Sequence, residues 1–377
     1  MKVEVITFDA DPDHGGFGTR VHGLVRMLSR FCDVRVVLTD WFGGPRVPGV
    51  EYEELPLKDT AGSRLRRLRT YYKTDFPDRT ARDGPDVAIV ESLDLLGLHQ
   101  YGEGVPLILD EHNIYWELLR YEIYNSPFFK TWFGRRRLVQ GWLAPRLLAR
   151  ARAFEVDAIR RAARTLVTSE SDRSVLLAAV PEVEDRVRVL PNCVDLDRFP
   201  SGGSPPETND VVFVGTYSYV PNRDAAVFVS QALAPEIPSA RFVLVGKDAP
   251  EAARGPNVVR TGYVADLQQV LDRAAICIAP LTQGSGTRLK VLTYLAAGKP
   301  VVATSKACDG LEVVDGVHVI IRDDREGMVA AIRELLEDPD RRRELGEAGR
   351  DLVRAKYDWR AHVGRLKEFI SEVRLSA

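Results

Sequence analysis

The stretch 280–304 constrains the fold of this chain most. It predicts a glycine turn, then a helix, then a strand, and it follows a predicted buried strand directly. The apolar run 275–279 predicts that first strand, which ends at Pro280. Apolar residues then recur at helical spacing, at Leu289, Leu292 and Ala296. Gly298 and Pro300 end the helix before the next apolar strand begins. This order is typical of an α/β domain with a parallel sheet.

The loop between the first of these strands and the helix is suited to bind an anion. Gly284 and Gly286 lack a Cβ, so the backbone between them can come close to a ligand. The helix is expected to begin near Thr287, and its unpaired N–H groups attract negative charge. Arg288 and Lys290 add two cations. We therefore predict a phosphate site here; the alternative is that the glycines only form a tight turn.

The length and composition indicate a globular protein of two domains. The chain has 377 residues, of which 45% are hydrophobic and 28% charged. Its 52 basic and 54 acidic residues nearly balance, so nucleic acid is not an expected partner. The four cysteines lack metal-ligand spacing and form no disulfide pattern. The first residues predict a strand rather than a signal peptide, and no apolar run reaches the roughly 20 residues of a membrane span, so we expect a cytoplasmic location.

The first half of the chain alternates strands and helices. Residues 3–8 predict a strand, a loop follows, and a helix is expected from Thr19. Further strands are predicted at 34–38, 86–91, 105–110, 164–168 and 187–190. The loop glycines Gly15, Gly16 and Gly18 could approach a phosphate, although their spacing is not that of the dinucleotide-binding fingerprint. The alternative is a purely structural turn.

His112 follows the predicted strand 105–110 directly. The carboxyl ends of parallel strands are where such sheets bind ligands. Taken alone, His112 fits a hydrogen-bonded structural histidine somewhat better than a ligand-binding one.

The second half of the chain predicts another doubly wound sheet. Its strands are expected at 211–215, 242–246, 258–261, 276–279 and 301–304. Beyond residue 321 the pattern predicts only helices, at 325–336, 341–356 and 359–374. The segment 201–206 is rich in turn-forming residues and is interpreted as the linker between the domains.

Two segments, 64–73 and 130–152, interleave arginines with aromatic and aliphatic residues. Such segments could contact an anionic membrane surface. Solvated helices whose arginine stems cover apolar surface are an equal alternative.

The order Gly-Ser-Gly-Thr-Arg-Leu-Lys, followed by Ala-Ala-Gly-Lys-Pro-Val-Val, strongly resembles glycosyltransferase family 4, the retaining enzymes of GT-B architecture. Residues 191–195, Pro-Asn-Cys-Val-Asp, resemble the segment that closes the first domain in that family. The resemblance implies two Rossmann-like domains facing across a cleft. Residues 1–200 would bind the acceptor, 207–358 the nucleotide sugar, and the last helix, 359–377, would cross back to the first domain.

The resemblance also implies roles for individual residues. His112 would hydrogen-bond the donor sugar, and with Arg288 and Lys290 it is a candidate for catalysis. The donor would contact residues of both domains: Gly15, Gly16, Gly215, Tyr263, Val264, Gly284, Ser285, Gly286, Thr287 and Thr293.

The chain departs from the family at four of its charged positions. Ser285 and Thr293 stand where most members carry glutamates, and Thr216 and Pro221 stand where many carry an arginine and a lysine. The departing nucleoside diphosphate gains negative charge during transfer, and this charge must still be stabilised. We expect Arg288 and Lys290 to replace the missing cations.

The resemblance therefore predicts a retaining glycosyltransferase, acting in glycoconjugate or polysaccharide biosynthesis, that moves a sugar from a nucleotide-diphosphate donor to a glycan, lipid-linked or small-molecule acceptor. One alternative is a nucleotide-sugar epimerase, for which His112, Glu91 and Glu111 are the available acids and bases. The other is an inactive sugar-binding homologue. Asp-x-Asp strings at 9–11, 11–13 and 195–197 are expected by chance among 54 acidic residues, so we expect no metal and no cofactor.

Overall fold

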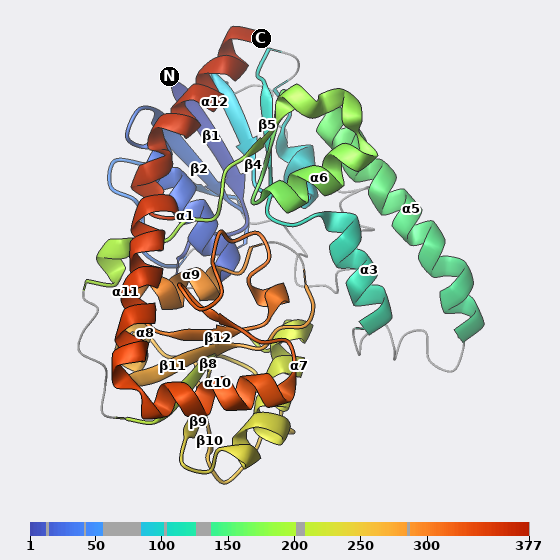
Figure 1. Ribbon diagram of the computed structural model, residues 1–377. Coiled ribbons are helices and arrows are strands. Elements are labelled where there is room, and N and C mark those ends of the chain that lie inside the picture. Colours follow the sequence, from blue (N-terminus) through green and yellow to red (C-terminus); the bar gives the residue numbers. More distant parts are fainter. Residues whose placement is uncertain are drawn as a thin grey trace. The chain divides into compact units, whose positions relative to one another are not determined.

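The structure is a computed structural model that describes residues 1–12, 15–40, 43–55, 84–101, 104–125, 137–200, 208–284 and 287–376. The chain divides into two compact units. The first unit combines Met1–Asn192 with Trp359–Ala377, and the second unit is Cys193–Asp358. Each unit is an α/β domain built on its own parallel sheet (Figure 1).

The sheet of the first unit contains seven parallel strands among the described residues, in the order β3-β2-β1-β4-β5-β6-β7. Their bounds are β1 (Lys2–Thr7), β2 (Asp33–Leu38), β3 (Glu51–Glu54), β4 (Val87–Val90), β5 (Leu107–Glu111), β6 (Arg164–Val167) and β7 (Val187–Val189). Val3 of β1 lies opposite Val34 of β2 and Val87 of β4. The central strands β1, β4 and β5 are almost entirely buried, and most of their residues are apolar, because helices cover both faces of the sheet.

The helices of the first unit are α1 (Gly16–Leu28), η1 (Leu93–Leu98), α3 (Tyr115–Asn125), α5 (Arg137–Arg161), α6 (Glu170–Ala179), η2 (Pro181–Arg186), η7 (Trp359–His362) and α12 (Val363–Ser376). The two C-terminal helices pack against α1. Trp359 of η7 is buried, and the guanidinium of Arg26 on α1 lies 4.7 Å from the centre of its ring. The end of the chain thus completes the first unit.

The sheet of the second unit has the order β10-β9-β8-β11-β12-β13, again with parallel neighbours throughout. Its strands are β8 (Asp210–Val214), β9 (Arg241–Val245), β10 (Val258–Gly262), β11 (Ala274–Ala279), β12 (Val301–Ala303) and β13 (Ile320–Ile321). Its helices are η3 (Leu196–Arg198), α7 (Val220–Phe228), η4 (Val229–Leu233), η5 (Ala234–Glu236), α8 (Leu267–Arg273), α9 (Leu289–Ala296), η6 (Ser305–Ala307), α10 (Arg325–Glu337) and α11 (Pro339–Lys356). Helix α9 packs against α11 (Figure 1).

All strands predicted from the alternation of the sequence are present, with small shifts at their ends. Two strands were not predicted. β3 has the sequence Glu-Tyr-Glu-Glu and forms an edge of its sheet, so it lacks the apolar run of a buried strand, and β13 has only two residues. Helix α1 begins at Gly16 rather than at Thr19, and α9 begins at Leu289 rather than at Thr287.

The division between the units falls after Asn192, earlier than the expected boundary near residue 200. The backbone N–H of Val194 donates to the carbonyl of Tyr357 at 2.9 Å, and Phe199 belongs to the core of the second unit. Residues 193–200 therefore pack with the second unit. The expected linker, 201–206, lies outside the described residues.

Candidate functional site

The strand order places a ligand-binding position in each unit. The order of the strands reverses between β1 and β4 in the first sheet and between β8 and β11 in the second. On one side of each point later strands are added leftward in the order, and on the other side rightward. Ligands of doubly wound sheets bind beyond the carboxyl ends of the strands at such a point. Gly15 follows β1, whereas Gly215 and the loop 280–288 follow β8 and β11. These three predicted positions thus follow strands that border the switch points.

The turn from β1 to α1 is shaped by glycine. Gly15 has a φ of 109°, which side-chain-bearing residues rarely adopt, and Gly16 is the first residue of α1. A Cβ on Gly18 would collide with the backbone of Asp11. No side chain among the described residues caps this helix, and its first turn contains no acidic residue. The turn is therefore compatible with an anion, and the role predicted for Gly15 and Gly16 stays a prediction.

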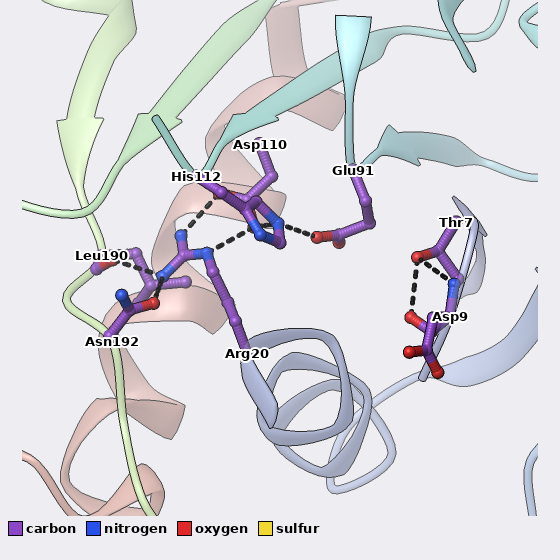
Figure 2. Close-up of polar contacts among 8 residues, drawn as sticks. All are labelled: Thr7, Asp9, Arg20, Glu91, Asp110, His112, Leu190 and Asn192. Carbon is purple, nitrogen blue, oxygen red and sulfur yellow. Dashed lines mark hydrogen bonds and ion pairs between the residues drawn. The ribbon is translucent and has the colours of Figure 1, made fainter. Parts of the chain in front are cut away.

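His112 lies just beyond β5 and is held by the ends of two strands (Figure 2). Its Nε2 is 2.8 Å from Oε2 of Glu91, which follows β4, and 3.6 Å from Oδ2 of Asp110. The ring stacks on Phe17 of α1, with ring centres 4.4 Å apart. Burial lowers the pKa of His112 to about 4, so the imidazole is neutral at pH 7.

Arg20 of α1 anchors the same cluster (Figure 2). Its Nε and Nη2 donate to the two carboxylate oxygens of Asp110 at 2.9 and 2.5 Å. Its Nη1 donates to the carbonyl of Leu190 and to Oδ1 of Asn192 at 3.0 and 3.1 Å. Burial opposes the charge of Asp110, but Arg20 outweighs it and holds the pKa of Asp110 below its usual value. Burial and Asp110 instead raise the pKa of Glu91 well above its usual value.

Glu91, Asp110 and His112 bring three atoms of metal-ligand type within 4.8 Å of one another. Arg20 occupies both oxygens of Asp110, and its positive charge opposes a second cation at this place. The residues therefore fit a hydrogen-bonded cluster better than a metal centre.

The Asp-x-Asp strings serve local structure as far as they are described. Asp9 accepts a hydrogen bond from the N–H of Asp11 at 2.7 Å, and its own carbonyl accepts one from the hydroxyl of Thr7 at 2.9 Å (Figure 2). Asp195 caps η3 by accepting from the N–H of Asp197. Asp13 lies outside the described residues.

In the second unit, Arg288 lies against the glycine loop. A Cβ on Gly284 would come within 2.7 Å of Nη2 of Arg288 and 2.8 Å of the hydroxyl of Tyr219. Gly284 also has a φ of 114°, a conformation that favours glycine. Thr287 and Arg288 are buried. Ser285 and Gly286 lie outside the described residues.

Lys290 lies in the first turn of α9 and points toward the end of β8. Its Nζ donates to Oδ1 of Asn222 at 2.5 Å and lies 4.4 Å from the centre of the Phe213 ring. Asn222 in turn donates to the carbonyl of Thr216 at 2.9 Å, and a Cβ on Gly215 would come within 2.9 Å of the Asn222 side chain. Gly215 thus leaves room for the residue that positions Lys290. Burial, and then the charge of Arg288, lower the pKa of Lys290 well below its usual value.

The remaining predicted donor residues differ in exposure. Thr293 donates its hydroxyl to the carbonyl of Leu289 at 3.0 Å, within its own helix. Tyr263 follows β10 with 56% of its surface exposed, and Nζ of Lys247 lies 5.0 Å from its ring centre. Val264 is partly buried against the core of the second unit. The contacts predicted for these residues with the donor stay predictions.

Comparison with known proteins identifies the family. Residues 14–198 match the model described as Glycosyltransferase Family 4, and residues 208–338 match the model described as Glycosyl transferases group 1. The chain belongs to this glycosyltransferase family. It is a glycosyltransferase enzyme, as the resemblance predicted.

Two curated relatives show how far the similarity extends along the glycosyltransferase. It is 24% identical to the alpha-maltose-1-phosphate synthase of Mycolicibacterium smegmatis over 96% of this chain and 97% of that protein. It is also 24% identical to the glycogen synthase of Mycobacterium tuberculosis strain H37Rv, over 62% of this chain. That match spans 59% of the length of the glycogen synthase.

Solved structures confirm the predicted fold class. Sucrose-phosphate synthase from Thermosynechococcus elongatus superimposes with a TM-score of 0.77 at 18% identity, covering 100% of both chains. Anabaena HepE in complex with UDP and glucose gives a TM-score of 0.68 at 15% identity, covering 98% of this chain and 99% of that one. The glycosyltransferase therefore has two Rossmann-like domains of GT-B type.

Sequence reasoning missed several residues that build these clusters. Arg20 and Asp110 were not identified, although Arg20 adjoins the apolar stripe of α1, where a charge signals a buried partner. Asn222 was also missed, although it directly follows Pro221, where the resemblance implies that a cation is lost. Glu91 was named only as an acid for the epimerase alternative.

Proposed function

We propose that the glycosyltransferase moves a sugar, with retention of its anomeric configuration, from a nucleoside-diphosphate sugar to a glycan, a lipid-linked or a small-molecule acceptor. The observation that carries the proposal is the pairing of Lys290 with Arg288 beside the glycine loop. Burial and the charge of Arg288 lower the pKa of Lys290, and a bound diphosphate would offset both effects. Asn222 supports this role because it fixes Lys290 at the end of β8.

The chemistry follows from the charge of the leaving group. The diphosphate gains negative charge as the glycosidic bond breaks, and Arg288 and Lys290 would stabilise that charge at the transition state. No enzymic nucleophile is required, because the leaving phosphate can accept the proton of the acceptor hydroxyl. We propose no metal and no cofactor for this step, since two side-chain cations can supply the positive charge.

The nucleotide is proposed to bind beyond the carboxyl ends of β8 and β10. Tyr263 offers an exposed ring there, and the backbone of Val264 lies beside it. Anabaena HepE, a structural neighbour of this chain, binds UDP and UDP-glucose. UDP-sugars are therefore the first donors to test.

A thermal-shift screen against UDP-, GDP-, ADP- and dTDP-sugars tests the proposal. A ligand that binds only the folded state stabilises it by about 2.7 kcal/mol at a concentration of 100 times its Kd. One nucleotide class is expected to raise the melting temperature, with a smaller effect in Lys290→Ala. The exposed Lys306, which pairs with Asp309, provides the matched control Lys306→Ala. The proposal fails if no nucleotide sugar shifts the melting temperature.

The cluster around His112 gives the epimerase alternative a specific basis. A carboxyl group that favours its protonated form lies 2.8 Å from a neutral imidazole, so an acid and a base are adjacent. Incubating the nucleotide sugar without an acceptor separates the two functions. A transferase leaves the sugar unchanged or hydrolyses it slowly, whereas an epimerase converts it to its epimer.

We also propose a cytoplasmic location and a membrane-linked acceptor, and the basic segments of the chain support the second of these. The segment 64–73 and residues 130–136 lie outside the described residues, and the described part of 130–152 includes exposed Arg146 and Arg150 on α5. No described helix has the apolar length that crossing a bilayer requires. Flotation with vesicles of anionic lipid is expected to recover the protein, and Arg146→Glu/Arg150→Glu should weaken recovery. Equal recovery with neutral vesicles would contradict electrostatic contact.

A further inference from the structure

We propose that Glu91 is a positioning residue: as a neutral acid it holds His112 in the tautomer that carries hydrogen on Nε2, which leaves Nδ1 to accept a hydroxyl hydrogen from the ligand. Only the identity of that hydroxyl, on the sugar or on its acceptor, rests on the proposed function. The arrangement of the four side chains Arg20, Glu91, Asp110 and His112 carries the rest (Figure 2).

The tautomer of His112 follows from the two carboxyl oxygens that lie nearest to its Nε2. Oε2 of Glu91 is 2.8 Å away and Oδ2 of Asp110 is 3.6 Å away. Asp110 is the ionised partner, because Arg20 donates to both of its oxygens. A ring nitrogen that faces an anionic oxygen is favoured as an N–H donor, since its lone pair would be repelled. Nε2 therefore carries the hydrogen and donates it to Glu91.

Glu91 is the group that keeps its proton. The charged side chains that act on it are Asp110 from β5, which opposes its ionisation, and Arg20 from α1, which favours it. Arg20 is already engaged with Asp110, so a second carboxylate beside Asp110 would be a buried like charge. Glu91 is completely buried, and its Oε1 has no hydrogen-bond partner among the described residues. Because Oε1 has no partner in this described part of the chain, the proton that neutral Glu91 shares with Asp110 lies on Oε2, and a lone pair of the same oxygen accepts from Nε2–H of His112.

The remaining contacts direct Nδ1. Phe17 stacks on one face of the imidazole, with an angle of 27° between the rings, and fixes its plane. Nδ1 makes no hydrogen bond with the part of the chain that the structure describes. The side chain of His112 keeps 11% of its surface exposed. A bare Nδ1 accepts a hydrogen bond, so it selects a ligand group that donates one, such as a sugar hydroxyl.

Nitrogen-15 NMR of histidine-labelled, unliganded protein tests the tautomer without any substrate. The wild-type protein is expected to show His112 with hydrogen on Nε2 at pH 7. Glu91→Gln should preserve this state, because the amide oxygen can accept from Nε2–H as the carboxyl oxygen does. Glu91→Leu should raise the population of the tautomer with hydrogen on Nδ1, because only the more distant Asp110 then favours hydrogen on Nε2. The matched control is Glu111→Gln, a second buried carboxyl, which should leave the His112 signals unchanged. Hydrogen on Nδ1 in the wild-type protein would overturn the proposal.

Kinetics with UDP-glucose as the probe donor extend the test. Glu91→Leu is expected to lower kcat by roughly 10-fold or more, and Glu91→Gln to restore most of that loss, because both the native acid and the amide are neutral. If Glu91 acted as an anion or held a metal, Glu91→Gln would lose as much as Glu91→Leu, which would contradict the proposal. A Zn²⁺-induced shift of the Nε2 signal would contradict it as well. Absence of any turnover in the wild-type protein would count against the proposed function, while the NMR result still decides the tautomer.

Discussion

In the second unit, Lys290 is a buried amine whose surroundings disfavour its positive charge. Its Nζ has one neutral hydrogen-bond acceptor in Asn222 and lies over the Phe213 ring, while Arg288 repels its charge. An amine in such surroundings gives up its proton more readily than a solvated lysine does. Among the described residues, no carboxylate raises the pKa of Lys290. A bound diphosphate would supply that negative charge and so raise the pKa. Ligand binding and protonation of Lys290 are therefore linked.

This linkage predicts proton uptake when a nucleoside diphosphate binds. The unliganded pKa of Lys290 is lowered, and the ligand raises it, so the affinity for UDP should fall as the pH rises above the lowered pKa, by up to about tenfold per pH unit. Calorimetry in two buffers of different ionisation enthalpy measures the protons taken up. Lys290→Met should abolish the uptake. Proton release by the wild-type protein would contradict the assignment.

Residue-level features were predictable only where the sequence carries a local pattern. The loop with Gly284 and the cations after it was visible because its residues are adjacent. The contact of Arg20 with Asp110 joins residues 90 positions apart, and no local spacing reports such a pair. Asn222 and Lys290 are 68 positions apart and escaped prediction for the same reason.

At the level of elements, a buried ion pair joins α1 to β5. Arg20 also reaches the carbonyl of Leu190 and the side chain of Asn192, which follow β7, so one side chain connects three elements. Both partners of the pair are almost fully buried. Removing one partner of a buried pair leaves an uncompensated charge.

Arg20→Met is therefore expected to lower the free energy of unfolding of the first unit by about 3–5 kcal/mol, because Asp110 is left buried and ionised. Arg20→Met/Asp110→Leu should recover most of that loss. Denaturant unfolding of the two variants measures the difference. The account of this cluster is wrong if the double variant is no more stable than the single one.

Glu155 of α5 caps the N-terminus of α3. Its two carboxyl oxygens accept from the N–H groups of Tyr115 and Trp116 at 2.8 and 2.9 Å, and its side chain is completely buried. These N–H groups have no partner within their own helix. Glu155→Ala should therefore destabilise the first unit by about 2–3 kcal/mol in urea unfolding. A loss below about 0.5 kcal/mol would show that water replaces the carboxyl.

The same residue predicts a pH dependence of stability. Burial raises the pKa of Glu155 from 4.5 to about 8, so the folded state keeps a proton that the unfolded state releases between these values. Its contribution is complete below pH 4.5 and is lost as the pH rises through about 8. Between pH 5 and 8, Glu155 should contribute up to one proton to the slope of the unfolding free energy against pH. Glu155→Gln should remove this contribution, so its unfolding free energy should fall less steeply. An identical slope in the variant and the wild-type protein would exclude this assignment.

Element boundaries were predicted well where burial sets the pattern. Strands covered on both faces are mostly apolar, so β4 and β11 are visible in the sequence as apolar runs. β3 pairs with one neighbour only and is made mostly of glutamate, so it gives no such signal. The sequence placed the start of α9 near Thr287, but the helix begins at Leu289, because Thr287 and Arg288 continue the glycine loop.

At the level of the whole molecule, two sheets of similar topology each carry candidate functional residues beyond their strand ends. The first unit offers the cluster of His112, and the second offers the cations after its glycine loop. The GT-B fold and the family were predictable from sequence because the motif of the second unit is compact. The units divide after Asn192 rather than after the glycine-rich segment, since the intervening residues pack into the second core, which composition alone does not reveal.

The most direct test of this account is the turnover of Arg288→Ala and Lys290→Ala with the nucleotide sugar that stabilises the wild-type protein. Each variant is expected to lose about 100-fold in kcat, because each removes a cation that stabilises the leaving diphosphate. Lys306→Ala should keep the wild-type rate. If both Arg288→Ala and Lys290→Ala transfer sugar as fast as the wild-type protein, these cations do not bind the leaving group and the proposed site is wrong.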